Sequence, residues 1–251
     1  MTHEFEVRDQ IEVEATPEQV WEAISTGPGI DSWLMGRNQM DQHEGGRGRM
    51  DMGGFVIEST VTTWQPPNHL VYQGDPAPDG SFHAFEYLVE GRAGGSTVVR
   101  FVHSGFLGDD WEAEYDGLRK GDPMYLRKLG EYLKYFFRRP STPVAAFAGE
   151  TPGREASWEK VHAALGLTAP VALDQRVHLT PAGLPAMDGV VDYVSEDFLG
   201  VRTADGLYRF IYGYNGAFVL GHHLFAEPGG QPIDEKDANQ AWQAWLGTVF
   251  A

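Results

Sequence analysis

Alternation of apolar and polar residues marks the first half of the chain as rich in strands. Residues 7–14 alternate around Ile11 and Val13, which predicts a strand. Thr16-Pro17-Glu18-Gln19 then supplies an N-cap, a proline at the first helical position and a capping-box partner, so a helix is expected to begin there. Segments rich in β-branched and aromatic residues follow at 46–52, 55–64, 69–73, 82–90 and 97–103. Because no helical pattern interrupts them, they predict an antiparallel sheet.

After Phe106 the apolar residues recur with a helical period. The acidic run at residues 109–116 predicts the start of a helix, and Asp122-Pro123 marks either a new cap or a kink. Beyond this point one apolar face, about three turns long, is formed by Leu126, Leu129, Leu133, Phe136 and Phe137. Arg127, Lys128 and Lys134 lie off this face and predict a solvated surface. A strand that leads into such a helix is typical of a curved sheet that closes over a cavity.

The second half of the chain repeats this order of elements on a smaller scale. Pro140-Ser-Thr-Pro143 predicts a linker over residues 140–150, and Thr151-Pro152 again precedes a helical pattern. Within that pattern Trp158-Glu-Lys-Val161 echoes Trp21-Glu-Ala-Ile24. Strands are expected near residues 171–180, 189–194, 198–202, 207–212 and 218–225, and a closing helix over residues 237–250. We therefore expect two domains, residues 1–139 and 151–251, the second a shorter and degenerate copy of the first.

Composition and charge exclude several classes of function. The chain has 251 residues, and 19 Lys and Arg against 36 Asp and Glu give a net charge of −17, which disfavours nucleic acid and anionic membrane surfaces as partners. It contains no Cys, so disulfides, thiolate nucleophiles and Cys-ligated metals are excluded. No window approaches the roughly 20 apolar residues that span a bilayer, and the first residues are acidic. The sequence predicts a cytoplasmic protein.

A resemblance to a known family can be stated from these segments. Its residues are Thr16-Pro17 followed by Val20-Trp21, the stretch 30–34 with Trp33, the stretch 99–106 with His103-Ser-Gly-Phe, and the closing helix. In this order and spacing, residues 5–139 resemble the START-like superfamily, also called SRPBCC or helix-grip. Within it they are similar to the branch of the activator of the Hsp90 ATPase and of polyketide cyclases. The resemblance implies an α+β fold in which a curved antiparallel sheet wraps around a long C-terminal helix, with an apolar cavity between them.

Strand alternation indicates which residues face that cavity. Phe101 and His103 share one face of their strand, and by the resemblance this face turns toward the closing helix. The partner strand adds His83, Phe85 and Tyr87. For each position a plain core role is the alternative to ligand contact. The predicted ligand-binding residues are Trp33, Trp64, His83, Phe85, Tyr87, Phe101, His103, Phe106, Trp111, Leu126, Leu129 and Leu133.

His103 is the candidate for chemistry, because a histidine has a pKa near neutrality and can act as a general acid or base. The alternative is a structural histidine held by a backbone carbonyl or by a carboxylate such as Glu112 or Glu114. Ser104 beside it lacks the Gly-x-Ser-x-Gly context of a nucleophile.

Two other motifs do not indicate a site. His222-His223 suggests a metal only weakly, because adjacent strand residues point to opposite faces, so one of them is expected to be exposed and no metal site is predicted. Gly45-Gly-Arg-Gly48 lacks the Lys and Ser or Thr of a phosphate-binding loop and predicts a hairpin turn.

These observations leave three classes of function. The absence of an assembled catalytic constellation favours a binding protein for a small apolar, aromatic or lipid-like ligand, without a cofactor. The alternative is an enzyme similar to polyketide cyclases and aromatases, with His103 as the acid or base in the cavity. A weaker alternative, implied by the resemblance alone, is a chaperone partner resembling the activator of the Hsp90 ATPase. A chaperone and a second copy of the chain are thus the protein partners left open.

Overall fold

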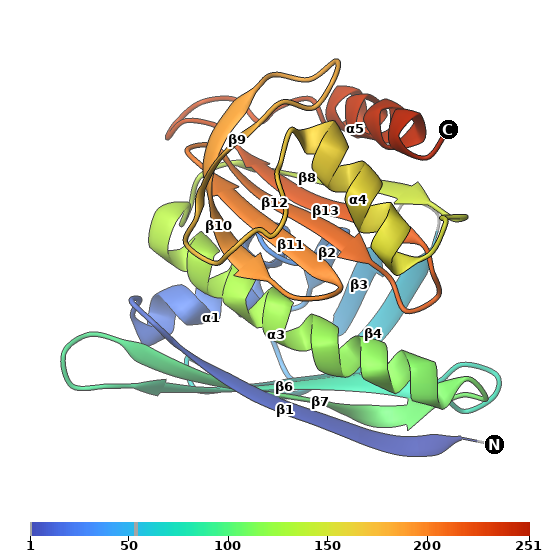
Figure 1. Ribbon diagram of the computed structural model, residues 1–251. Coiled ribbons are helices and arrows are strands. Elements are labelled where there is room, and N and C mark those ends of the chain that lie inside the picture. Colours follow the sequence, from blue (N-terminus) through green and yellow to red (C-terminus); the bar gives the residue numbers. More distant parts are fainter. Residues whose placement is uncertain (1, 53–54) are drawn as a thin grey trace. The chain divides into compact units, whose positions relative to one another are not determined.

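The computed structural model describes residues 2–52 and 55–251, and the chain divides into two compact units, residues 1–137 and 138–251. Each unit contains one antiparallel sheet with its own helices (Figure 1). Among the described residues, no helix has the length and apolar character needed to cross a membrane.

The first unit is a seven-stranded sheet closed by a long helix. Its order is β1-β7-β6-β5-β4-β3-β2, so the first strand pairs with the last. All neighbouring strands are antiparallel, as the uninterrupted run of strand patterns predicts. The elements are β1 (His3–Val13), α1 (Pro17–Ser25), α2 (Gly27–Ile30), β2 (Arg37–Met40), β3 (Arg47–Asp51), β4 (Val56–Gln65), β5 (His69–Gly74), β6 (Phe82–Gly91), β7 (Thr97–Leu107) and α3 (Trp111–Tyr135).

Local signals fix the start of α1 and the segment after it. The side chain of Thr16 accepts the N–H of Gln19 at 3.3 Å, and the side chain of Gln19 accepts the N–H of Thr16 at 2.9 Å, which completes the predicted capping box. After α2, the indole N–H of Trp33 donates to the carbonyl oxygen of Ala23 at 2.9 Å. This bond holds the buried ring of Trp33 against the end of α1.

Helix α3 runs along the sheet over β1, β7 and β6 (Figure 1). It continues through Pro123, so of the two alternatives at Asp122-Pro123 the new cap is wrong. A proline inside a helix removes one hydrogen bond and does not by itself end the helix where packing on a sheet holds both sides. The apolar face predicted for Leu126, Leu129 and Leu133 is buried.

The basic residues of α3 are not uniformly solvated. Arg127 pairs with Glu131 at 2.9 Å and Lys134 with Glu14 at 3.1 Å, and both cations are exposed. Lys128, in contrast, is 0% exposed, so the predicted solvated surface is wrong at this position.

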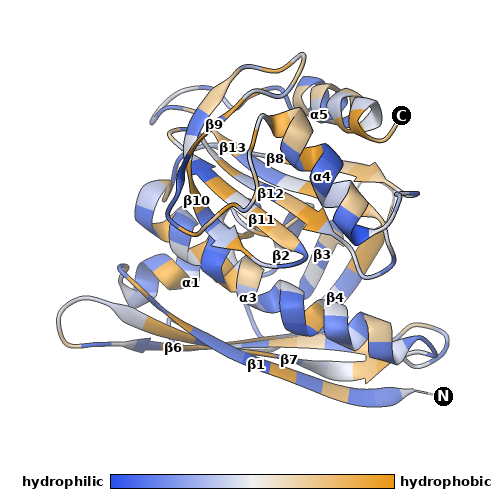
Figure 2. Cartoon of the chain, viewed as in Figure 1, coloured by the Kyte–Doolittle hydropathy of each residue, from blue (hydrophilic) through white to orange (hydrophobic). Residues whose placement is uncertain are grey.

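Strand alternation is visible along β1, where hydrophilic and hydrophobic residues follow one another (Figure 2). In β7 the residues that share the face of His103 are all buried. Register pairs Phe85 of β6 with His103 and Tyr87 with Phe101, so these four side chains lie on the same face of the sheet. That face is the one covered by α3, which places the aromatic set of β6 and β7 under the helix.

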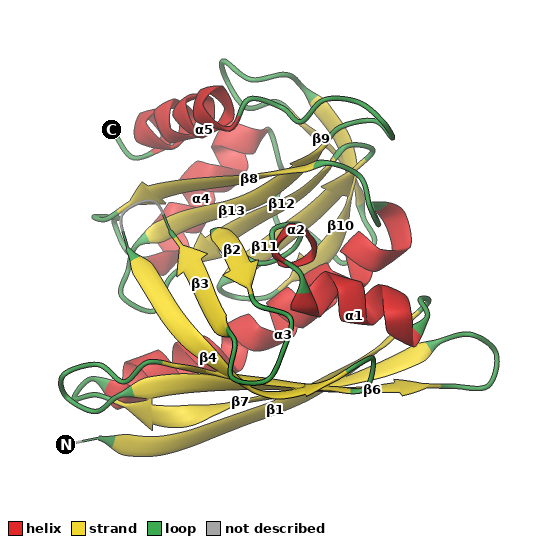
Figure 3. Ribbon diagram, turned by 180° about the vertical axis from the view of Figure 1, so that it is seen from behind, coloured by secondary structure: helices red, strands yellow, loops and turns green. Residues whose placement is uncertain are grey.

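The second unit repeats the topology with one strand fewer. Its order is β8-β13-β12-β11-β10-β9, so again the first strand pairs with the last and the others follow in sequence (Figure 3). The predicted α+β fold with a second, shorter copy is thereby confirmed. The elements are β8 (Ser141–Ala148), α4 (Arg154–Leu165), β9 (Arg176–Leu179), β10 (Met187–Val194), β11 (Phe198–Thr203), β12 (Gly206–Tyr212), β13 (Phe218–Phe225) and α5 (Glu235–Val249).

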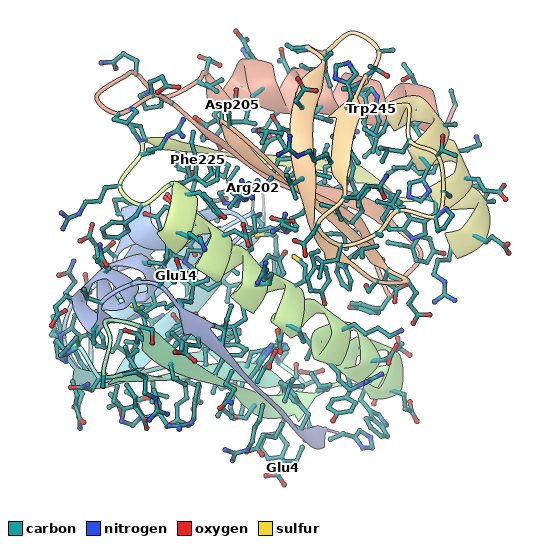
Figure 4. All side chains as sticks on the ribbon, turned by 60° about the vertical axis from the view of Figure 1, so that its left-hand side comes forward. Glu4, Glu14, Arg202, Asp205, Phe225 and Trp245 are labelled. Carbon is teal, nitrogen blue, oxygen red and sulfur yellow. The ribbon has the colours of Figure 1, made fainter. Side chains whose placement is uncertain are left out.

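The core of the second unit lies between the sheet and the helices α4 and α5. Val161 and Leu165 of α4 and Trp242 and Trp245 of α5 pack with buried strand residues. Asp205, in the turn between β11 and β12, lies near Phe225, the last residue of β13 (Figure 4), and the N–H of Phe225 donates to the carbonyl oxygen of Asp205 at 2.8 Å.

The linker expected over residues 140–150 is wrong, because most of it forms β8. Pro143 and the residues around it pair with β13, with Pro143 opposite His223. Strand β8 is an edge strand, where a proline leaves no ladder donor missing on the paired side. Pro143 is therefore compatible with an edge strand here.

Candidate functional site

A small aromatic cavity lies between the sheet and α3 of the first unit. Its volume is about 40 Å³. Six of its nine lining side chains are aromatic, and Asp122 contributes the one carboxylate among them. Pockets for drug-sized ligands measure roughly 300–1,000 Å³, so in this conformation the cavity is much smaller than such a ligand. The lining residues are Trp33, Leu34, Tyr72, Phe85, Tyr87, Phe101, Asp122, Tyr125 and Leu126.

Five of the predicted ligand-binding residues line this cavity: Trp33, Phe85, Tyr87, Phe101 and Leu126. The rings form a stack on the sheet, with the centroid of Phe85 5.1 Å from that of Tyr72 and 6.2 Å from that of Phe101. The register of β5, β6 and β7 produces this stack, because Tyr72 is opposite Phe85 and Phe85 is opposite His103.

The other apolar candidates lie elsewhere. Trp64 packs edge-on against Trp21 of α1, with ring centroids 4.9 Å apart, and Trp111 stacks on His3 at 4.9 Å. Phe106 contacts Phe82 on the face of the sheet opposite His103, because strand residues an odd number of positions apart point to opposite faces. Leu129 and Leu133 are buried further along α3. These five residues form packing contacts outside the cavity lining.

His103 is the centre of a chain of titratable groups behind the cavity. Its Nδ1 lies 3.0 Å from Oδ2 of Asp122, and its Nε2 lies 2.9 Å from Nδ1 of His83. His83 in turn has its Nε2 3.5 Å from Oε1 of Glu114. The chain Asp122–His103–His83–Glu114 thus begins at the cavity wall and ends at a carboxylate whose side chain is 29% exposed.

The elements explain why these groups meet. His83 and His103 are diagonal neighbours on adjacent strands, because His103 is opposite Phe85 and His83 is opposite Gly105. Asp122 and Glu114 are both on α3, eight residues apart, which is about 12 Å along a helix. The two histidines bridge this interval from the sheet side.

Burial changes the pKa of two members of this group of four side chains, in opposite directions. Burial, together with the smaller effect of the nearby His103, lowers the pKa of His83 to about 4. Burial also raises the pKa of the Glu114 carboxyl, an effect that the nearby His103 opposes and the nearby Asp79 strengthens. At neutral pH His83 is therefore a neutral imidazole, with one ring nitrogen that donates and one that accepts.

The tyrosines of the cavity form a second polar pair. The phenol groups of Tyr72 and Tyr87 are hydrogen-bonded to each other, and burial raises the pKa of Tyr72 to about 12 and that of Tyr87 well above its ordinary value. The negative charge of Asp122 adds to both shifts. Both phenols therefore stay protonated and can serve as hydrogen-bond donors at neutral pH.

The sequence interpretation of His103 is partly corrected. The carboxylate that holds His103 is Asp122, whereas Glu114 contacts His83 and Glu112 lies in the exposed first turn of α3. Asp122, Tyr72, Leu34 and Tyr125 were not among the predicted site residues. One signal for Asp122 was present, since it lies four residues before Leu126 on the apolar face of α3.

His222 and His223 are both fully buried, so the expectation that one is exposed is wrong. Most residues of β13 are buried, and therefore both faces of the strand are covered. Nδ1 of His222 accepts the backbone N–H of Arg209 at 3.0 Å, and its ring packs edge-on against Trp242 at 4.4 Å. Within the described part of the chain, no group of three or more His, Asp or Glu side chains is placed to hold a metal ion.

One protein-family model matches most of the first unit. Residues 14–134 match the family model described as activator of Hsp90 ATPase homolog 1-like protein. None of the curated proteins compared with the chain matches it.

Several solved structures are similar to the chain. Protein MLL2253 from Mesorhizobium loti is 23% identical and has a TM-score of 0.47, over 53% of this chain and 98% of that chain. The di-domain ARO/CYC BexL from the BE-7585A biosynthetic pathway is 14% identical with a TM-score of 0.48, over 97% of this chain and 94% of its own. DynU16 of the dynemicin biosynthetic locus is 17% identical with a TM-score of 0.46, over 98% and 95%.

At these identities and TM-scores no function is transferred to the chain. The family model covers the strands, helices and cavity residues of the first unit from Glu14 to Lys134. The resemblance predicted from the sequence is therefore confirmed over this range, where the first unit matches the family model of activator of Hsp90 ATPase homolog 1-like proteins.

Proposed function

We propose that the first unit binds a small apolar or aromatic molecule between its sheet and α3. The observation that carries this proposal is the aromatic cavity, in which stacked rings of β5, β6 and β7 face α3 around one carboxylate. Flat rings favour aromatic partners, because offset stacking adds about 0.5–1.5 kcal/mol to the burial of apolar area. Asp122 and the paired phenols give the cavity the few polar groups that orient a ligand.

Ligand entry requires the cavity to widen. Four of the residues that line it are buried, namely Trp33, Tyr87, Phe101 and Leu126. Two others, Leu34 and Tyr125, are half-buried. Leu34 belongs to the short segment between α2 and β2, which consists of turns and bends without strand or helix. Rotation of the half-buried side chains opens this side without moving the sheet, and this is the route on which the proposal depends.

The proposal is tested with N-phenyl-1-naphthylamine, a neutral aromatic probe whose fluorescence rises on burial. We expect saturable binding to the whole chain. Leu126→Trp fills the cavity from α3 and should weaken binding at least ten-fold. Phe82→Trp is the matched control, because Phe82 contacts Phe106 on the other face of the same sheet and should leave binding unchanged.

Circular dichroism and a thermal melt establish that both variants are folded. Equal binding by wild type and Leu126→Trp would place the probe outside the cavity. Failure of the wild-type chain to bind the probe, together with a native mass spectrum free of co-purified small molecules, would contradict the proposal.

A second candidate function, an enzyme similar to cyclases and aromatases, has one observation in its favour. His103 is hydrogen-bonded to Asp122, and Asp122 lines the cavity. His103 itself is 3% exposed and does not line it. A substrate would therefore meet the carboxylate of Asp122, with the imidazole behind it.

A further inference from the structure

We propose that Asp122, His103, His83 and Glu114 form a proton relay that makes the cavity an acid–base site for weakly acidic aromatic molecules. This inference rests on the proposed function, because it requires a molecule bound against Asp122. It adds a path along which protons pass between Asp122 in the cavity wall and the solvent near Glu114. The relay crosses from the helix to the sheet and back to the helix.

Asp122 is the member that can touch a bound molecule. One of its oxygens, Oδ2, is taken by His103, while Oδ1 has no hydrogen-bond partner among the described residues. Asp122 is also the one carboxylate in the cavity lining, and aromatic rings surround it. Oδ1 is therefore the atom to which a C–H or O–H group of the bound molecule delivers its proton.

Hydrogen-bonding roles along the relay follow from the carboxylate of Asp122, which only accepts. In one state, Nδ1–H of His103 donates to Asp122, Nδ1–H of His83 donates to Nε2 of His103, and the proton of Glu114 faces Nε2 of His83. In the other state, each of these three protons has moved along its own hydrogen bond. Asp122 is then protonated, Nε2 of each histidine carries the hydrogen, and Glu114 is a carboxylate.

The two states give Asp122 both roles of an acid–base group. No imidazolium forms in either state, which agrees with the burial of His103 and with the lowered pKa of His83. With the proton on Glu114, Asp122 is a base toward the ligand, and with the proton on Asp122 it is an acid. The distance of 3.5 Å between His83 and Glu114 is the longest step, and a small rotation or one bridging water closes it.

Glu114 connects the relay to solvent. Its side chain is 29% exposed, and Asp79 is the nearby acidic group that acts on its charge. The ring of His83 packs on one side against Phe5, with centroids 5.5 Å apart. The side chain of His83 is itself 35% exposed, so proton exchange with water takes place at this outer end of the relay, at Glu114 and His83.

The relay is tested with 5-nitrobenzisoxazole, an aromatic probe that reports on a base in an apolar site. A base takes its C–H proton, the C–H electron pair completes a nitrile, the N–O bond breaks, and a coloured cyanophenolate leaves. Asp122 receives the proton in this step. We expect the wild-type chain to accelerate the reaction over the same concentration of acetate, and Asp122→Asn to lower the rate at least ten-fold.

Glu114→Gln and His83→Gln interrupt the relay away from the cavity. Each should lower the rate several-fold and shift its pH profile, whereas Glu112→Gln should change neither, because Glu112 is exposed in the same turn of α3 and touches no member of the relay. Nitrogen-15 NMR of the histidine rings gives a readout besides rate. Asp122→Asn should change the ring nitrogen shifts of both His103 and His83.

The outcomes separate this inference from the proposed function. Retention of N-phenyl-1-naphthylamine binding by Asp122→Asn, together with loss of the reaction, supports the relay. Binding of that probe with the same reaction rate in Asp122→Asn, Glu114→Gln and wild type overturns the relay and leaves the binding proposal standing. Absence of probe binding by the wild-type chain, together with a native mass spectrum free of co-purified small molecules, overturns both. If Asp122→Asn leaves the nitrogen-15 chemical shifts of the His83 ring unchanged, the relay is also overturned.

Discussion

His83 carries a lowered pKa, and the sign of its effect on stability can be stated. The folded chain holds the pKa of His83 at about 4, against an ordinary value of 6.5. Between these two values the unfolded chain binds more protons, so the free energy of unfolding falls as the pH drops from about 6.5 to about 4. One histidine contributes at most about 1.4 kcal/mol per pH unit, and the partial exposure of His83 makes the slope smaller.

Urea denaturation of wild type and His83→Gln across this pH range measures the effect. The difference between the two curves isolates His83 from other titrating groups, including His162, whose pKa burial also lowers. We expect the variant to lose less stability than wild type on acidification. Parallel pH dependence of the two proteins would show that His83 is not desolvated in solution.

The buried ion pair of the second unit gives a second prediction at the residue scale. Nη2 of Arg209 lies 2.9 Å from Oδ2 of Asp192, with side chains 0% and 2% exposed. Asp192→Asn leaves the guanidinium buried without its counter-charge and should cost about 3–5 kcal/mol in the free energy of unfolding. Replacing both partners with Leu and Met should cost less than this single change.

Chemical denaturation of the single and double variants measures these costs. The exposed pair of Arg8 and Glu6 serves as the control, and Arg8→Ala should leave the free energy of unfolding nearly unchanged. A single variant Asp192→Asn as stable as wild type would mean that water reaches Arg209 in solution.

Asp122 shows which features of the site could be predicted from the sequence and which could not. The helical period that identifies Leu126 and Leu129 extends back to Asp122, so its place on the inner face of α3 was predictable. Its Asp-Pro context instead favoured a cap. The pairing of His83 with His103 was also within reach, because the hairpin loop 92–96 sets Phe85 opposite His103. The contact of α3 with these strands joins residues far apart in sequence, and no local pattern contains it.

At the scale of elements, Gly105 is the position where β7 tolerates no side chain. Its φ is +146°, and a Cβ built there would lie 2.1 Å from the carbonyl oxygen of Phe82 on β6. Gly105→Ala must therefore push β6 and β7 apart beside His83. We expect a loss of about 2–4 kcal/mol in the free energy of unfolding, from backbone strain and overlap together.

Gly94→Ala is the matched control, since Gly94 also has a positive φ, +107°, but a Cβ there meets nothing within 4 Å. It should cost about 1 kcal/mol, from backbone strain alone. Equal losses in the two variants, measured by urea denaturation, would show that overlap with Phe82 is relieved at no cost.

The strands that could not be predicted from the sequence are those whose residue pattern is weak or points to another structure. Strand β2 has only four residues, Arg37–Met40, and little apolar alternation, so it depends on pairing with β3. Strand β8 contains a proline and resembles a linker until β13 pairs with it. The long strands β4, β6 and β7 have strong alternation and are confirmed to within a few residues, except that β7 extends four residues beyond its predicted end. Pairing partners, more than local propensity, decide the weak elements.

At the scale of the whole molecule, the repeat was predicted from element order and a four-residue echo. The sheet orders of the two units make the same case more strongly, because in each the first strand pairs with the last. In the first unit this pairing joins Val7 to His103, and in the second it joins Val144 to His222. Such distant pairings close large loops and leave no trace in local periodicity.

The charge balance of the chain gives a prediction that concerns every residue at once. Its net charge of −17 arises from 36 acidic against 19 basic residues. Like charges on a compact surface repel each other, and salt screens this repulsion over a distance of about 10 Å at 0.1 M. Exposed ion pairs such as Arg47 with Asp75 lose strength in salt as well, but each contributes little to stability because water screens it.

Repulsion among the excess carboxylates should outweigh the weakened pairs, so the melting temperature is expected to rise by several degrees between about 20 mM and about 500 mM sodium chloride. Differential scanning calorimetry at constant pH measures this change. Chloride is the suitable anion, because sulfate stabilises most proteins by exclusion from the surface and would mask the screening effect. A melting temperature that falls with sodium chloride would mean that the ion pairs, and not the net charge, dominate the surface electrostatics of this chain.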